Sequence, residues 1–271
     1  MVDFRQEMRM ETSLAGQEML SEADLGIELL WQVEAASQDF SIRQSIERVK
    51  LSMTSPGYPP VEYDSRNTQD ASPVAETIGK TVQPLLGVGF NQEMDARGRI
   101  TRVTVVNEQK KSPSAAAALN PAFSEDGLKD LLTQAAATLP EGPVNPGDSW
   151  DARSEVASPV GKLVMNIQYT YRGVEAHEGK SLDRIDVNVE MRFDDGPNAI
   201  GMPVKIAEQA CSGVVYFDNQ RGRLDHSEIH RRVVTETQIG DQVHRHLVDT
   251  GLQLRLREVN AMASLPAAAR K

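Results

Sequence analysis

The sequence has few cysteines, a deficit of basic residues and no long apolar runs. A single cysteine, Cys211, excludes an internal disulfide and a cysteine-based zinc cluster. Acidic residues outnumber lysines and arginines by 39 to 29, so the net charge is −10. This charge argues against a nucleic acid or an anionic membrane as partner, because phosphates require a positive surface. No apolar run approaches the roughly 18 residues that a membrane-spanning helix needs, so we expect no membrane span.

The first residues give two interpretations of where the protein works. Residues 1–5 lead directly into an alternating segment and carry no basic region, apolar stretch or cleavage site of a secretory signal. One interpretation is a cytoplasmic protein. The other is an exported protein whose signal has been removed, and these residues favour neither.

What the sequence has in abundance is the alternation of apolar and polar residues with a period of two. Three apolar sets are Ile27, Leu29, Trp31 and Val33; Leu163, Met165, Ile167, Tyr169 and Tyr171; and Ile185, Val187, Val189, Met191 and Phe193. Such alternation is typical of antiparallel strands with one buried and one hydrated face. Within residues 40–53 the apolar positions change from even to odd, which predicts a β-bulge near Glu47 and Arg48.

Helical spacing is found in only a few segments. Residues 124–139 follow Ser124 as a possible N-cap, carry Leu128 and Leu132 on one stripe, and end at Pro140. A second helix is predicted to start at Ser72, with a proline in its first turn. A less regular helical or loop pattern covers residues 199–209, and residues 110–121 resemble a linker.

These patterns predict a mainly β (α+β) fold. We expect a strongly bent antiparallel sheet or incomplete barrel of about nine to twelve strands, with two or three helices packed on its concave side. The chain is predicted to form a single domain built from two similar halves, residues 1–110 and 122–258, followed by a disordered tail at 259–271. Two separate domains are the alternative.

A repeat links the two ends of the chain. A shift of 225 positions aligns six identical residues out of nineteen: Glu11, Thr12, Gln17, Asp24, Gly26 and Leu29 with Glu236, Thr237, Gln242, Asp249, Gly251 and Leu254. Residues 97–100 (RGRI) also resemble residues 221–224 (RGRL), and both follow an aspartate, as hairpin turns do. Either the hairpins are related, by an ancient duplication, or turn chemistry simply recurs.

The turns also predict the register of two hairpins. A turn at Gly240 and Asp241 gives the cross-strand pairs Ile229–Leu252, Val233–Val248, Glu236–Arg245 and Arg232–Asp249. A turn at Ala15 and Gly16 gives Phe4–Ile27, Met8–Ala23, Arg9–Glu22 and Glu7–Asp24. The last pair joins like charges, which counts against this register unless nearby arginines compensate for it.

Catalytic and metal-binding motifs are not evident in the sequence. The predicted register places His226 and His230 on the charged face and His244 and His246 on the opposite face, so they cannot converge on one metal ion. Cys211 has no nucleophile motif around it. We therefore expect no metal, no cofactor and no catalytic residues, and an uncharacterised hydrolase is the remaining enzymatic alternative.

Methionines at strand positions can be interpreted in two ways. They can be ordinary core residues, or they can line a deformable apolar cavity, since methionine adapts to irregular partners. On the second interpretation the predicted ligand-binding residues are Trp31, Met165, Ile167, Tyr169, Val189 and Met191, with Leu128 and Leu132 of the helix as a cover.

Several motifs at turns and strand starts form a recognisable set. They are VEYDS at 61–65, PLLG at 84–87, MD at 94–95, FSEDGL at 123–128, GDSW at 147–150 and YFD at 216–218. The set resembles an uncharacterised family of bacterial proteins, mostly exported or lipid-anchored, that is known only as a domain of unknown function. The resemblance implies a location in the periplasm or cell envelope and supplies no catalytic residues. The architecture is similar to the half-barrels of periplasmic lipoprotein carriers, which is an analogy of architecture alone.

Two functions follow as hypotheses. The first is a non-catalytic binding protein of the cell envelope that carries or senses an apolar small molecule or lipid. The second is a structural module with a solid core that meets another envelope protein through its strand edges. An apolar cavity of several hundred Å³ would favour the first, and a filled interior would favour the second.

Overall fold

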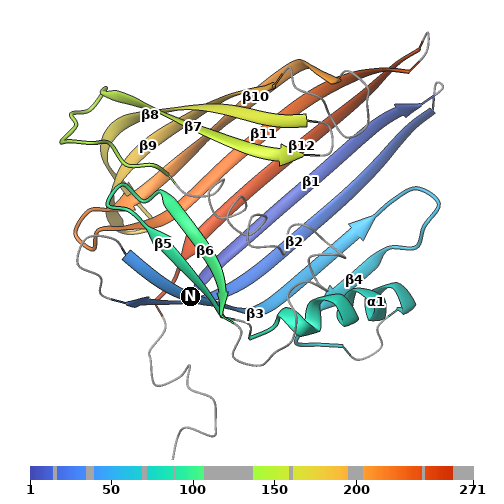
Figure 1. The fold of residues 1–271 in the computed structure, drawn as a ribbon, viewed down its shortest axis with the longest axis horizontal. Coiled ribbons are helices and arrows are strands. Elements are labelled where there is room, and N and C mark those ends of the chain that lie inside the picture. Colours follow the sequence, from blue (N-terminus) through green and yellow to red (C-terminus); the bar gives the residue numbers. More distant parts are fainter. Residues whose placement is uncertain are drawn as a thin grey trace, which may run out of the picture.

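The structure of the protein, a computed structural model, describes residues 1–14, 17–34, 40–68, 72–87, 89–106, 137–158, 161–194, 204–239 and 242–258. Within these ranges twelve strands form one sheet, as Figure 1 shows. The strands are β1 (Val2–Leu14), β2 (Gln17–Glu34), β3 (Phe40–Thr54), β4 (Val61–Asp64), β5 (Gly89–Met94), β6 (Ile100–Val106), β7 (Ser149–Ser158), β8 (Gly161–His177), β9 (Lys180–Phe193), β10 (Val204–Asp218), β11 (Arg223–Ile239) and β12 (Gln242–Leu256). The helices are α1 (Pro73–Val82) and the 3₁₀-helix η1 (Gln83–Leu85).

The sheet is antiparallel throughout and open. Its strand order is β6-β5-β3-β2-β1-β12-β11-β10-β9-β8-β7, and β4 also pairs with β3. The first and last strands, β1 and β12, lie side by side at the centre (Figure 1). Among the described residues no pairing joins β6 to β7, the two ends of the order. The prediction of a mainly β fold is confirmed.

The predicted hairpin registers are correct. Every cross-strand pair expected for the β11–β12 hairpin is present, and so is every pair expected for the β1–β2 hairpin. The like-charge pair of Glu7 and Asp24 is compensated by Arg5, whose guanidinium lies 2.9 Å from Glu7 and 2.5 Å from Asp24. The predicted bulge is also present, because Glu28 pairs with Arg48 while Leu29 pairs with Ile46.

One face of the sheet, here called the inner face, carries the apolar core. Its buried members include Val2, Phe4, Ile27, Leu29, Ile46, Val49, Ile229, Leu252 and Leu254 on the central strands, and Met165, Tyr169, Ile185, Val187 and Met191 on β8 and β9. The other face, the outer face, carries most of the ion pairs, as alternation requires. The polar side chain of Gln209 extends the sheet where β9 and β10 stop pairing, since it accepts from Met191 N at 2.7 Å and donates to Met191 O at 2.9 Å.

Helices contribute less than the sequence predicted. The part of the chain that the structure describes contains one α-helix, α1, instead of two or three. Ser72 caps α1 as predicted, its hydroxyl accepting from Ala75 N at 3.2 Å. The helix packs beside β4, where a side chain at Gly79 would meet the ring of Tyr63.

Two helix predictions need correction. Residues 204–209, predicted as helix or loop, belong to strand β10, because their polar and apolar residues continue the ladder with β11. Residues 137–139, the predicted end of the helix at 124–139, are not helical, since Leu139 pairs instead with Arg97. Residues 124–136, the linker at 110–121 and the tail at 259–271 lie outside the described residues. The division into two similar halves stays a prediction.

Candidate functional site

A cavity of about 670 Å³ opens at one end of the inner face. One wall consists of apolar residues from β2, β3, β5 and β6: Trp31, Val33, Phe40, Ile42, Met94 and Ile100. The facing wall consists of apolar residues from β10, β11 and β12: Val215, Phe217, Leu224, Leu254 and Leu256. Because β5 and β10 stand far apart in the strand order, the sheet must curve to bring these two walls together.

Two glycine turns of similar sequence frame the cavity. In the β5–β6 turn Gly98 has a φ of 78° and in the β10–β11 turn Gly222 has a φ of 63°, a backbone region that favours glycine. An aspartate stabilises each turn, since Asp95 accepts from Arg97 N and Arg99 N, and Asp218 accepts from Arg221 N, all at 3.0 Å. Both turns line the cavity.

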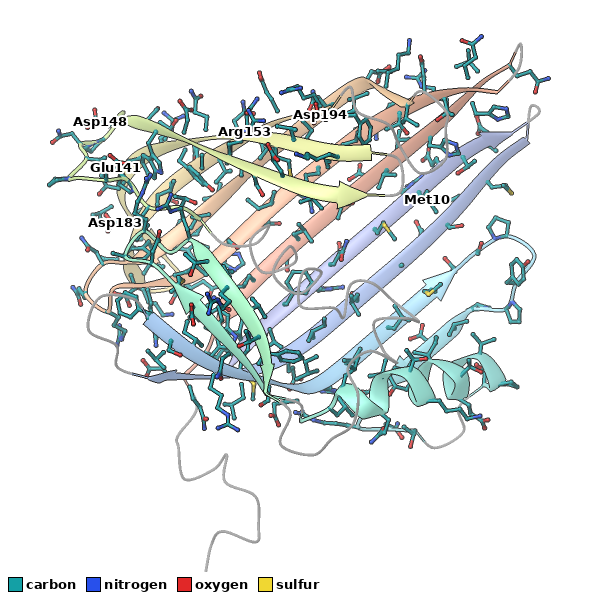
Figure 2. The ribbon with its side chains drawn as sticks, in the orientation of Figure 1. Met10, Glu141, Asp148, Arg153, Asp183 and Asp194 are labelled. Atoms are coloured by element: carbon teal, nitrogen blue, oxygen red, sulfur yellow. The ribbon has the colours of Figure 1, made fainter. Side chains whose placement is uncertain are left out.

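A short segment, residues 137–141, bridges the two open edges of the sheet beside the cavity. Leu139 N donates to Arg97 O at 2.7 Å, and Arg97 Nε donates to Leu139 O at 2.8 Å. On the other side the indole of Trp150 in β7 donates to Thr138 O at 2.7 Å and stacks on Tyr169 of β8. The segment therefore links the β5–β6 turn to β7 without any strand pairing. Figure 2 shows its acidic residue Glu141 at that end of the molecule, away from Met10.

Charged residues surround the mouth of the cavity. Arg223 Nη2 donates to Glu258 Oε1 at 2.9 Å, and Arg221 Nε lies 3.5 Å from the same oxygen. Arg257 is bound by both carboxylate oxygens of Asp3. The mouth is thus polar, whereas the walls are apolar, as in many small-molecule sites.

A few polar groups at or beside the cavity are buried. Gln92, which lines the cavity, accepts a hydrogen bond from buried Gln44 at 3.3 Å. The indole nitrogen of Trp31, the Nε of Arg223 and the carbonyl oxygen of Gln44 are buried without a hydrogen-bond partner. Buried polar groups of this kind are uncommon in proteins and mark places where a ligand or water can bind.

Residues 37–207 match the family of unknown function DUF6263. The chain belongs to this family. The resemblance predicted from the turn and strand motifs is thereby confirmed, and no curated protein matches the chain. Among solved structures, a DUF1329 family protein from Desulfovibrio piger shows 10% identity over 99% of this chain and 91% of that chain, with a TM-score of 0.18. A TM-score this low does not establish a shared fold.

The predicted ligand-binding residues of this DUF6263 chain fall into two places. Trp31 lines the cavity. Met165, Ile167, Tyr169, Val189 and Met191 meet across β8 and β9, where Met165 faces Met191 and Ile167 faces Val189. Four of these five are buried in the core and the fifth, Ile167, packs against it. Leu128 and Leu132 lie outside the described residues.

Most residues of the cavity walls, and the arginines at its mouth, were not predicted from the sequence. Alternation places Leu254 and Leu256 on the inner face but does not show which strand lies opposite them. The similar RGRI and RGRL segments were the one feature of the sequence that could have indicated the cavity. These two turns flank it from opposite sides.

Several methionines lie on the part of the inner face that is away from the cavity, toward the tip of the β1–β2 hairpin. Met8, Met10, Met19 and Met53 are each partly exposed there. Met10 is labelled in Figure 2. None of these four lines the cavity, although Met94 of β5 does. The methionine-lined ligand space stays a prediction.

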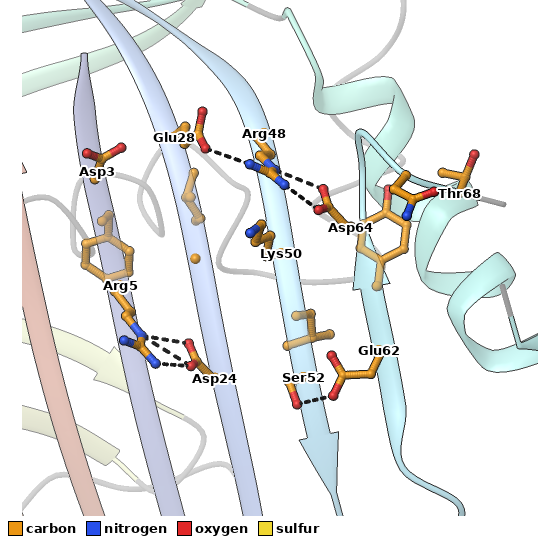
Figure 3. A pocket seen from close by; sticks show the side chains of 16 residues that line it. Asp3, Arg5, Asp24, Glu28, Arg48, Lys50, Ser52, Glu62, Asp64 and Thr68 are labelled. Carbon is orange, nitrogen blue, oxygen red and sulfur yellow. Dashed lines mark hydrogen bonds and ion pairs between the residues drawn. The ribbon is translucent and has the colours of Figure 1, made fainter. Parts of the chain in front are cut away.

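The outer face has a groove of about 690 Å³ over β1–β4, shown in Figure 3. Gly26 leaves a gap there between Arg5 and Lys50, the residues opposite it on either side. Most of the charged groups in this groove bind one another: Arg5 with Asp24, and Arg48 with Asp64 and Glu28 (Figure 3). This groove is lined mainly by charged and polar side chains, whereas the walls of the inner cavity are mainly apolar.

The histidines follow the predicted faces. His226 and His230 project from the outer face, and His244 and His246 lie on the inner face. Within the described ranges, no group of three or more histidine, cysteine or acidic side chains could hold a metal ion. The ring of His226 stacks on that of His177, with 5.8 Å between the ring centroids. Burial is the main cause that lowers the pKa of His226, and the nearby charges of Arg255 and His177 lower it further. Burial likewise raises the pKa of the Cys211 thiol, which favours its neutral form.

No described helix combines the length and apolar character that crossing a membrane requires.

Proposed function

We propose that this protein is a non-catalytic binding protein that carries or senses an apolar or lipid ligand in the cavity of the inner face. The observation that carries the proposal is the cavity itself, with about 670 Å³ between two mainly apolar walls. Ligand pockets typically measure about 300–1,000 Å³ and combine apolar walls with a few polar groups. The open, curved sheet then acts as an incomplete barrel around the ligand.

The energetics support an acyl chain as ligand. Each buried methylene contributes about 0.8 kcal/mol, so a ten-carbon chain gains about 8 kcal/mol before the cost of ordering is subtracted. A cell-envelope location is part of the proposal and rests on the export that the family resemblance implies.

A cavity-blocking variant tests the proposal. Val33 lines the cavity and is 68% exposed as a residue, so Val33→Trp adds bulk at the mouth without disturbing buried packing. Val174 is equally exposed and does not line the cavity, which makes Val174→Trp a matched control. We expect Val33→Trp to weaken binding of the neutral dye N-phenylnaphthylamine by about tenfold or more, because it fills ligand volume, and Val174→Trp to leave binding unchanged.

Native mass spectrometry of protein purified from bacteria provides the second measurement. We expect lipid or fatty acid to co-purify with the protein and to be displaced by the dye. If nothing co-purifies and the dye does not bind, the proposal is wrong. The alternative, a structural or interaction module with a solid core, then gains support from Met165, Tyr169, Val189 and Met191, which are buried in the core.

A further inference from the structure

Two arginines at the mouth of the cavity bind a single carboxylate oxygen of the same chain. Arg221 and Arg223 flank Gly222 in the β10–β11 turn, and Glu258 follows strand β12. Glu258 Oε1 accepts from Arg223 at 2.9 Å and lies 3.5 Å from Arg221 Nε. The turn therefore presents two guanidinium groups to one anionic group at the entrance of an apolar cavity.

One of the two arginines, Arg221, is fixed more firmly than the carboxylate that it shares with Arg223. Asp218, 5% exposed, accepts from Arg221 Nη1 at 2.8 Å and from the Arg221 backbone N at 3.0 Å. The Glu258 side chain, in contrast, is 67% exposed. Exposed ion pairs are weak in water, so another anion can replace Glu258 at little cost.

Two residues that line the cavity carry a buried donor that lacks an acceptor. Arg223 Nε and Trp31 Nε1 are buried without a hydrogen-bond partner, and both residues line the cavity. A buried donor without an acceptor is unfavourable, so a ligand that brings an acceptor gains from it. Arg257, the other arginine at the mouth, is already bound by both oxygens of Asp3.

We propose that the cavity takes an amphiphile with one apolar chain and an anionic head, a carboxylate or a phosphate, and that Arg221 and Arg223 bind this head in place of Glu258. The inference rests on the proposed function and narrows its ligand class. Guanidinium groups suit the task because their planar forks match carboxylate and phosphate oxygens.

The test compares three ten-carbon ligands, decanoate, decyl phosphate and decanol, by displacement of N-phenylnaphthylamine from the full chain. We expect both anions to compete more strongly than decanol. Arg223→Gln should weaken the anions by about tenfold, the loss of a charge-assisted hydrogen bond, and leave decanol unchanged. Arg153→Gln, an exposed and ion-paired site on β7, controls for the change in net charge.

A second variant is expected to strengthen the binding of the anionic ligands instead of weakening it. Glu258→Gln removes the competing carboxylate, so we expect it to tighten decanoate and decyl phosphate by a few-fold and to leave decanol unchanged. Glu155→Gln, at the ion-paired partner of Arg153, is the matched control. A purely structural role for Glu258 would weaken all three ligands together.

The outcomes separate this inference from the proposed function. If the dye binds but all three ligands compete equally, or if Arg223→Gln weakens decanol as much as decanoate, the anionic head is wrong and the apolar site stands. If the dye does not bind at all, both are wrong. The ratio of decanoate to decyl phosphate affinity identifies the preferred head.

Discussion

On the inner face of β1 the residue Phe4 is 2% exposed, whereas the side chain of the next residue, Arg5, is 53% exposed on the outer face. Phe4 packs into the core that runs across the central strands. Arg5 forms ion pairs with Asp24 and Glu7 at the solvent-exposed surface. The same strand thus contributes to stability by burial on one side and by weak charge pairing on the other, and the two contributions should differ in size and in their dependence on pH and salt.

The largest expected effect comes from the inner face. Phe4→Ala should lower the free energy of unfolding by about 3–5 kcal/mol, because it removes a buried ring and leaves a cavity. Denaturant unfolding measures this as a lower midpoint at unchanged slope. A loss below about 1 kcal/mol would show that the inner face repacks easily and would remove the contrast between the faces.

A recessed part of the outer face should show an intermediate effect. Arg48 has its side chain 22% exposed and binds Asp64 and Glu28. The hydrogen bond from Arg48 lowers the pKa of Asp64 from 3.8 to about 2. We expect Arg48→Gln to lower the free energy of unfolding by about 1–2 kcal/mol near neutral pH.

The pH dependence of this pair has a defined sign. Because the folded-state pKa of Asp64 is depressed, its stabilisation is present above pH 3.8 and is lost as the pH falls toward about 2. The difference between the wild type and Arg48→Gln should therefore disappear over that range in acid titrations followed by circular dichroism. A difference that persists at pH 2 would mean that Arg48 acts through packing instead of charge.

The smallest effect is expected at the exposed pair. Arg5→Ala should cost only about 0–1 kcal/mol, and moderate salt should remove most of this cost. Thermal unfolding at low and high salt measures it. A salt-independent loss comparable to that of Phe4→Ala would show that relief of the Glu7–Asp24 repulsion is essential for the register of β1 and β2.

The hairpins could be predicted in detail because the information is local. A turn such as Gly240–Asp241 determines every pair of the β11–β12 hairpin, and the change of phase at Glu47 reveals a bulge. The helix start at Ser72 was equally local. The segment at 204–209 was misassigned because its short polar pattern fits a helix, while pairing with β11 decides for a strand.

Most residues of the cavity walls could not be predicted because their meeting depends on the curvature of the sheet. Phe40 and Val215 belong to strands that are far apart in both the sequence and the strand order, and only the bend of the sheet brings them to the same cavity. Alternation assigns each residue to a face but contains no information on which strands meet across that face. The residues of the predicted cluster lie on the neighbouring strands β8 and β9. Alternation alone was enough to predict that they share one face of the sheet.

The central pairing of β1 with β12 has a consequence for biosynthesis. Val2 pairs with Leu256 across nearly the whole chain, so the middle of the sheet cannot form until the ribosome has released the last strand. Until then the strands on the two sides of the β1–β12 pair form separate parts of the sheet, and each part has an unpaired edge that is prone to aggregation. Closure over so long a loop is intrinsically slow, and a chaperone that shields β1 during translation would be expected to raise the yield of folded protein.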